Sequence, residues 1–295
     1  MAFGLLITSD IRLPIHQAPT ASISDINITK GTPPLSLNQV SAKGALFESN
    51  SSEYLLKVPG TGDFHISNGK DIIYHMTDPE LTNNVVTHIL ASCMAAVLHQ
   101  RGDIVLHASG IIINGGVILF GGPSGVGKST AATMMSKSGY PLISDDVTVL
   151  RKEGNSYKAW PGYPFSRLWQ DSLQNLDISS VGLETSIKSK NKYIVPSEKK
   201  NFPCDLNVGV KVNSLLLITL NGSDTYSLQQ IKAGQAIIAV SEIIFRKKMC
   251  IATNGSDYFF QQLTSLAKYL DIYEFNRPFT QWKPNELKEL ITTIK

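Results

Sequence analysis

The stretch of sequence that decides the fold is a glycine-rich loop, Gly122-Pro123-Ser124-Gly125-Val126-Gly127-Lys128-Ser129. It satisfies the Walker A pattern G-x-x-x-x-G-K-[ST]. The glycines let the backbone turn tightly and point its N–H groups inward, where they can bind an anion. We expect Lys128 to reach the β- and γ-phosphates of a nucleotide and the Ser129 hydroxyl to bind Mg²⁺. Thr130, which follows directly, belongs to the same predicted nucleotide site.

The flanking residues give this loop the context that a P-loop requires. Four apolar residues, 117–120, precede it and predict a buried strand. Residues 129–135 follow it and predict a helix, whose positive N-terminal end would face the bound phosphate. The order strand, loop, helix makes a chance match to the Walker A pattern improbable.

Two adjacent acids follow the next predicted strand. Residues 142–144 are apolar or small, and Asp145 and Asp146 come directly after them, where a Walker B acid would lie. One carboxylate is sufficient to hold Mg²⁺, so a second beside it could accept a proton from an attacking hydroxyl. Alternatively, one of the two acids only caps a turn.

A histidine precedes the P-loop in a predicted β-hairpin. Residues 104–113 and 117–120 are apolar and flank Asn114-Gly115-Gly116, a strong hairpin signal. A two-residue turn pairs Ile113 with Gly116, and the same register continued along the strands places His107 opposite Gly122, at the phosphate site. The alternative is a buried structural histidine in an apolar strand.

These segments together resemble the HPr kinase/phosphorylase family. The similarity lies in Leu106-His107-Ala108-Ser109-Gly110, the hairpin, the string Gly-Pro-Ser-Gly-Val-Gly-Lys-Ser-Thr, and Ser144-Asp145-Asp146. The resemblance implies a P-loop kinase core related to PEP carboxykinases, with ATP and Mg²⁺ as cofactors. It also implies that His107 and Asp145 deprotonate a serine hydroxyl, while Asp146 and Ser129 hold the metal.

Two features favour a particular branch of this family. Thr130 stands where HPr kinases usually have Glu, and the N-terminal third is shorter than their additional domain. The string Pro161-Gly162-Tyr163-Pro164, with the Leu168-Trp169 pair after it, is similar to HPr-kinase-like enzymes of lasso-peptide gene clusters. Those enzymes phosphorylate a serine at the C-terminus of a precursor peptide, and the resemblance implies such a partner here.

Two further cations are candidates for the phosphate site. Arg167 lies in an unusual segment, 160–169, which contains two prolines, a glycine and four aromatic residues. The segment is either a rigid structural turn or one wall of a substrate groove that directs Arg167 to phosphate. Lys192 is our choice among the lysines of a polar stretch, 182–203, which is either a solvated loop or a flap over the site. The others are Lys188, Lys190, Lys199 and Lys200.

Composition excludes several classes of function. The chain has 295 residues, 42% of them hydrophobic, and a formal charge of only +3, so nothing favours a nucleic-acid or membrane partner. Three widely spaced cysteines, Cys93, Cys204 and Cys250, predict neither a disulfide framework nor a zinc site. With no signal peptide and no membrane span expected, the prediction is a cytoplasmic protein, and a homo-oligomer is left open.

The predicted fold class is α/β. Residues 1–76 read as a β-rich N-terminal layer, and 77–295 as a P-loop kinase core with a mixed sheet, opened by a helix with Asp78 as N-cap. Further helices are expected at 232–246, 256–270 and 284–294. The predicted activity is ATP-dependent phosphoryl transfer to a serine hydroxyl. The alternatives are a nucleotide-hydrolysing switch, although no Asn-Lys-x-Asp or Ser-Gly-Gly string occurs, and a non-catalytic nucleotide-binding partner protein.

Overall fold

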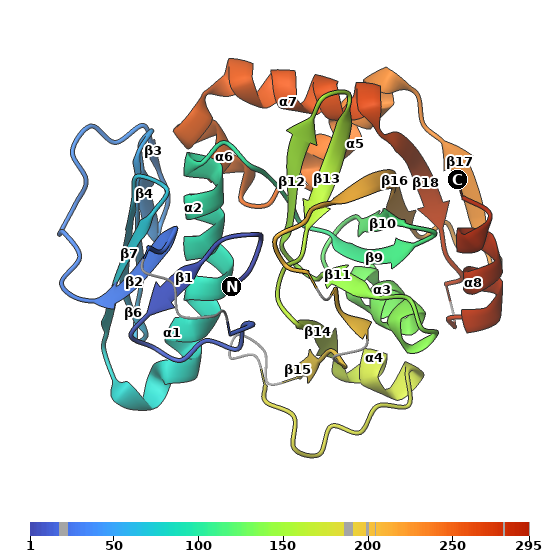
Figure 1. The fold of residues 1–295 in the computed structure, drawn as a ribbon, viewed down its shortest axis with the longest axis horizontal. Coiled ribbons are helices and arrows are strands. Elements are labelled where there is room, and N and C mark those ends of the chain that lie inside the picture. Colours follow the sequence, from blue (N-terminus) through green and yellow to red (C-terminus); the bar gives the residue numbers. More distant parts are fainter. Residues whose placement is uncertain (18–22, 186–190, 199–200, 204, 280, 295) are drawn as a thin grey trace.

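A computed structural model describes residues 1–17, 23–185, 191–198, 201–203, 205–279 and 281–294. Figure 1 shows two sheets, with a long helical segment between the N-terminal sheet and the rest of the chain. Helices cover the second, larger sheet on its outer sides (Figure 1). Of the lysines in the polar stretch, Lys188, Lys190, Lys199 and Lys200 lie outside the described residues, as does Cys204.

The N-terminal sheet has seven strands in the order β1-β2-β7-β6-β5-β4-β3. Their bounds are β1 Ile7–Ser9, β2 Ile26–Lys30, β3 Ala42–Lys43, β4 Phe47–Ser49, β5 Glu53–Val58, β6 Gly62–Ser67 and β7 Asp71–Met76. Asn68 and Gly69 form the hairpin turn between β6 and β7, and both residues have positive φ, 56° and 61°. The stretch 30–52 contains the short strands β3 and β4.

A helical segment packs against this sheet and begins where the sequence predicts. The Oδ1 atom of Asp78 accepts a hydrogen bond from the N–H of Glu80 at 2.9 Å, as an N-cap does. The segment runs through η1 Pro79–Leu81, α1 Thr82–His88, the π-helical turn η2 Ile89–Cys93 and α2 Met94–Gln100. By length and composition 79–100 would suffice to cross a membrane, which the sequence analysis did not expect. However, 67% of its most apolar window is buried within the protein, as in the core helix of a soluble fold.

The larger sheet is mixed, which confirms the α/β class. Its main order is β11-β9-β10-β16-β13-β12-β8, with β18 beside β16 and β17 beside β18. The pairs β10–β16 and β16–β18 are parallel, and the other pairs are antiparallel. The bounds are β8 Ile104–Leu106, β9 Ser109–Ile113, β10 Gly116–Gly121, β11 Leu142–Ser144, β12 Thr148–Glu153, β13 Ser156–Trp160, β16 Val210–Thr219, β17 Ser227–Gln230 and β18 Asp271–Asn276.

Helices and a two-stranded ribbon complete the core. The ribbon pairs β14 Phe165–Trp169 with β15 Lys192–Pro196. The helices are α3 Lys128–Lys137, α4 Gln170–Asn175, α5 Ala233–Glu242, α6 Lys247–Asn254, α7 Ser256–Tyr269 and α8 Pro284–Thr292. The helix predicted over 232–246 ends early, because 243–246 leave the helical path and Arg246 adopts the left-handed conformation at φ 55°.

The hairpin before the P-loop has the predicted turn but not the predicted strand. Ile113 pairs with Gly116 across Asn114 and Gly115, both at positive φ, so the register is confirmed. The strand expected over 104–113 is two strands, because residues 104–106 pair with β12 as β8 and the chain pairs with β10 only from Ser109, as β9. The prediction that the hairpin register continues to His107 and places it opposite Gly122 is therefore wrong.

The two broken strands form one long bent antiparallel pair. On one side of the bend Ser144 lies opposite Gly110, and on the other side Thr148 lies opposite Leu106, four residues further along each strand. From Ser144 onward the register is thus the same on both sides of the bend, although it shifts between Leu142 and Ser144 and although β9 and β8 have different neighbours. Residues 107–108 and 145–147 form the bend, and the predicted catalytic groups lie there.

The predicted boundary after residue 76 coincides with the end of β7. One hydrophobic cluster nevertheless joins the N-terminal sheet and the helical segment to the larger sheet, through residues such as Phe64, Leu90, Val149 and Phe165. The two parts therefore share a core. Cys93 and Cys250 are buried and free.

Candidate active site

The glycine-rich loop joins β10 to α3 as the Walker A pattern predicts. Gly127 has a φ of 109°, and a Cβ atom there would lie 2.5 Å from the Trp282 ring. Arg277 donates from Nε to the carbonyl oxygen of Val126 at 2.9 Å, and its guanidinium lies 4.8 Å from the centre of the Trp282 ring. The C-terminal segment therefore braces the loop, a role that the sequence analysis missed.

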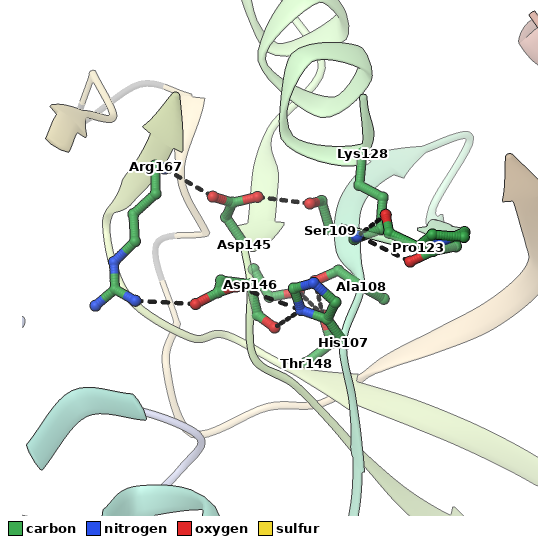
Figure 2. Close-up of polar contacts among 11 residues, drawn as sticks. His107, Ala108, Ser109, Pro123, Lys128, Asp145, Asp146, Thr148 and Arg167 are labelled. Atoms are coloured by element: carbon green, nitrogen blue, oxygen red, sulfur yellow. Dashed lines mark hydrogen bonds and ion pairs between the residues drawn. The ribbon is translucent and has the colours of Figure 1, made fainter. Parts of the chain in front are cut away.

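Lys128 folds back onto its own loop. Its Nζ donates to the carbonyl oxygens of Gly122 and Pro123 at 2.9 and 2.8 Å (Figure 2). The side chain is buried, and this burial lowers the pKa of Lys128 to about 8 despite the nearby charges of Asp145 and Asp146. An anion in the loop would supply the negative charge that this ammonium lacks.

The two acids occupy different environments. Asp145 is only 3% exposed, and both of its oxygens accept hydrogen bonds, from the Ser109 hydroxyl at 2.5 Å and from the backbone N–H of Arg167 at 2.8 Å. It thereby ties β9 to β14 (Figure 2). Asp146 instead lines the pocket at the P-loop, and it adopts a φ of 66°, which is uncommon for a residue other than glycine.

His107 contacts Asp146 and not Asp145. Its Nδ1 lies 3.1 Å from the carbonyl oxygen of Asp146 and 3.3 Å from the Oδ1 of the same residue. A carbonyl oxygen only accepts hydrogen bonds, so Nδ1 carries the proton and the Nε2 of a neutral ring keeps its lone pair. Among the described residues, Nε2 has no hydrogen-bond partner. The geometry thus leaves the Nε2 lone pair of His107 available to act as a base.

Burial of His107 favours its neutral form. Burial lowers the pKa of His107, an effect that Asp146 opposes and the Lys128 ammonium reinforces, and the net shift is downward. Burial would raise the pKa of Asp146, but the Arg167 guanidinium, followed by His107 and two lysines, holds it below its ordinary value. At neutral pH the pair is an imidazole beside a carboxylate.

Arg167 and Lys192, both proposed from sequence, reach the same site from the β14–β15 ribbon. Arg167 donates from Nη1 to Oδ2 of Asp146 at 2.9 Å, and its Nε is buried without a partner among the described residues. The Lys192 Nζ lies 5.6 Å from the centre of the Trp169 ring. The segment before β14 also has a structural role, because Tyr163 stacks on Phe165 and donates to the carbonyl oxygen of Leu90.

Two pockets adjoin at this site. The smaller is a recess of about 40 Å³ over the P-loop, lined by residues such as Gly125, Lys128, Ser129 and Thr130. The larger, about 530 Å³, extends towards the helical segment and is lined by Ser92 and Arg246, among others. The residues common to both are His107, Ser124, Asp146, Arg167, Trp169 and Lys192.

The structure brings most of the predicted site residues to these pockets. Of the P-loop, Gly122, Pro123 and Val126 do not line the recess, and Thr130 hydrogen-bonds the Ser172 hydroxyl at 2.8 Å. Asp145 lies behind the recess and does not line it. Sequence reasoning missed Ser109, although it lies two residues from His107, and it missed Arg246, which no local pattern marks.

The oxygen donors of the recess fit a small hard cation. The Ser129 hydroxyl and the Asp146 carboxylate line the same recess. Mg²⁺ is commonly held by one or two protein oxygens, with waters and substrate phosphates completing its shell. Within the described part of the chain no cluster of three or more His, Cys, Asp or Glu side chains could hold a metal alone, which is compatible with such a shared site.

No protein-family model matches the chain, and no curated protein matches it. Among solved structures, one that matches is the Hpr(Ser) kinase/phosphatase from Coxiella burnetii. The identity is 16%, and the match covers 64% of this chain and 92% of that chain at a TM-score of 0.31. A likeness this distant carries no functional argument, so the interpretation of the site rests on its own geometry.

Proposed function

We propose that this protein is a kinase that transfers the γ-phosphoryl group of ATP to a serine hydroxyl of a peptide or protein. The observation that carries the proposal is the position of His107. Its unprotonated Nε2 belongs to a side chain that lines both the P-loop recess and the larger pocket beside it. A general base at that junction has no role in nucleotide binding alone but is required to activate an acceptor.

The phosphate side is supported by four cationic or hydrogen-bonding groups. The backbone N–H groups of the P-loop, Lys128 and Lys192 would bind the triphosphate, and the buried Nε of Arg167 still has a donor to offer. Ser129 and Asp146 would hold Mg²⁺, which when bound screens the charge of the phosphates. Arg277 and Trp282, which contact the loop at Val126 and Gly127, would hold it in place when the phosphates bind.

The transfer step follows from the contacts of His107. Nε2 accepts the proton of the acceptor hydroxyl as its oxygen attacks the γ-phosphorus, and the bond from that phosphorus to the β–γ bridging oxygen breaks in line, releasing ADP. Asp146 stabilises the imidazolium that results, because it faces the Nδ1–H. The sequence-based proposal gave the base role to His107 with Asp145; the observed contact supports Asp146 as the partner of His107 and Asp145 as a positioning residue.

A lasso-peptide precursor with a C-terminal serine is the acceptor that the sequence resemblance suggests. The size of the larger pocket, about 530 Å³, suits one or two residues of a peptide. A cytoplasmic location, where ATP is abundant, is part of the same proposal.

The experiment is incubation of the protein with ATP labelled at the γ-phosphate and with serine-containing peptides, followed by separate measurement of phosphopeptide and free phosphate. We expect phosphopeptide that requires Mg²⁺ and His107. Release of free phosphate at the same rate with and without peptides would instead identify a nucleotide-hydrolysing switch. Nucleotide binding without either product would identify a non-catalytic nucleotide-binding protein.

A further inference from the structure

Beyond the transfer itself, the geometry points to an acceptor that carries a carboxylate, bound in the larger pocket by Arg246. This inference rests on the proposed kinase function and names the substrate class of that same site. It depends on three observations: the charge that Arg246 leaves unpaired, the backbone contacts that fix it relative to His107, and the balance of charges around the pocket.

Arg246 presents an unpaired charge at the pocket. It lies in the left-handed conformation between α5 and α6, and its side chain is exposed. The guanidinium donates from Nη2 to the Ser92 hydroxyl at 2.8 Å and lies 5.6 Å from the centre of the Phe245 ring. No carboxylate pairs with it among the described residues. A guanidinium offers five N–H donors, so most of its capacity to bind a carboxylate is free.

The position of Arg246 relative to His107 is fixed by the backbone. The N–H of His107 donates to the carbonyl oxygen of Ile243 at 2.7 Å, and the N–H of Phe245 donates to the carbonyl oxygen of Val105 at 2.9 Å. Residues 243–245 therefore run beside β8 like an additional antiparallel strand. The Phe245 ring also packs against the His107 ring, with 5.7 Å between centroids. Residues 105–107 and 243–246 thus form one hydrogen-bonded unit that carries both the base and the guanidinium.

The other end of this unit is tied to the helical segment. The imidazole Nε2 of His99 lies 2.8 Å from the carbonyl oxygen of Phe245. Ser92, which holds the guanidinium, is buried in the same segment. Arg246 is therefore held from both sides of the larger pocket and is preorganised before an acceptor binds, which reduces the entropy that binding would cost.

The remaining charges of the larger pocket favour an anion. Its two acids are already paired, Asp146 with Arg167 at 2.9 Å and Glu242 with Lys247 at 2.9 Å. Lys192 and Arg246 are left without a carboxylate among the described residues. Lys192 also lines the P-loop recess and would face the nucleotide, whereas Arg246 lines only the larger pocket. The charge available to the acceptor is therefore that of Arg246.

The same carboxylate chemistry could come from the C-terminus of a peptide or from an acidic side chain near the serine. Three synthetic peptides with a single serine distinguish these sources. One ends in that serine with a free carboxylate, the second is the same peptide amidated, and the third is amidated with the serine followed by aspartate. The kcat and KM for each peptide would be measured with wild-type protein and with Arg246→Gln.

We expect at least one carboxylate-bearing peptide to be favoured over the amidated neutral one. For that peptide, Arg246→Gln should raise KM roughly 10- to 100-fold, the loss expected when a hydrogen-bonded charge pair is removed. The KM for ATP and the melting temperature should change little. Arg246→Lys should restore part of the affinity, because it keeps the charge but not the bidentate geometry.

A matched control separates local recognition from general electrostatics. Lys248→Gln removes an equal charge two residues away, from α6, on an exposed side chain that does not line the pocket. We expect it to leave the KM for every peptide unchanged. Equal losses in Arg246→Gln and Lys248→Gln would overturn the inference.

The test also distinguishes failure of this inference from failure of the proposed function. If wild-type protein phosphorylates all three peptides equally and Arg246→Gln has no effect, the kinase function stands and the role of Arg246 is wrong. If wild-type protein phosphorylates none of them, both proposals fall.

Discussion

The Nδ1 atom of His107 lies 3.1 Å from the carbonyl oxygen of Asp146 and 3.3 Å from its Oδ1, at the point where two long strands bend together. This contact makes Nδ1 the protonated nitrogen and leaves Nε2 as a base. Figure 2 shows the pair between Arg167 on one side and Lys128 on the other.

Replacement of His107 should remove the transfer step while nucleotide still binds. We expect His107→Ala to reduce kcat roughly 10²–10⁴-fold, the usual effect of losing a general base. The Kd for ATP should stay within a few-fold of wild type, because the P-loop contacts remain. The measurement is single-turnover transfer beside an ATP titration. A purely structural histidine predicts the opposite pattern, a lower melting temperature with near-normal turnover of the folded protein.

The pH dependence of kcat/KM for ATP should be bell-shaped. Burial lowers the pKa of His107 below 6.5, so the neutral base is lost only as pH falls through that lower value. Burial lowers the pKa of Lys128 to about 8, so its charge is lost as pH rises above 8. We expect a plateau between these limits. Lys128→Arg should move the upper limb to higher pH, since Arg stays charged, and an unmoved limb would assign it to another group.

Asp145 should tolerate a change to Asn that a general base would not. The Oδ1 of Asn can accept from the N–H of Arg167, and its Nδ2 can donate to the Ser109 hydroxyl, so both buried partners remain satisfied. We expect Asp145→Asn to retain kcat within about tenfold of wild type, whereas loss of a base costs roughly 10²–10⁴-fold. Asp145→Ala should lower stability by about 1–3 kcal/mol for each unpaired partner. Thermal melts and turnover of both variants, measured together, would test the positioning role.

Asp146→Asn should weaken Mg²⁺ binding and slow the transfer step. It removes the carboxylate that faces the Nδ1–H of His107, the Arg167 guanidinium and the proposed Mg²⁺. We expect a higher Mg²⁺ concentration for half-maximal activity and a kcat lowered by more than in Asp145→Asn. The measurement is a Mg²⁺ titration of both variants at saturating ATP. If only Asp145→Asn requires more Mg²⁺, Asp145 holds the metal, and the roles expected from the sequence are exchanged.

Lys128→Ala should abolish transfer without destabilising the fold. Among the described residues, the Nζ of Lys128 hydrogen-bonds only loop carbonyls, and burial disfavours its charged form, so the folded protein gains little from this ammonium. Bound phosphate depends on it, because it supplies charge in a site shielded from water. We expect a melting temperature equal to or above that of wild type, with turnover lost. Turnover within threefold of wild type would contradict the P-loop assignment.

The sequence by itself determined the local elements around the P-loop. Hard backbone preferences fix them: Asn114-Gly115 takes the positive φ values of a tight turn, and Asp78 caps its helix. The glycine pattern likewise gives the loop its shape between β10 and α3. Each of these depends on residues close together in the chain, so short-range reasoning is sufficient.

Only the tertiary structure decided how the chemical groups pair. The strand predicted as continuous through His107 changes neighbours at that residue, since β8 and β9 bond to different strands. That bend turns Asp146 into the pocket and leaves Asp145 behind it with Ser109. Arg246 lies more than 100 residues after His107 in the chain, where no motif marks it. Contacts between distant segments depend on how the whole sheet packs, and no local pattern encodes that.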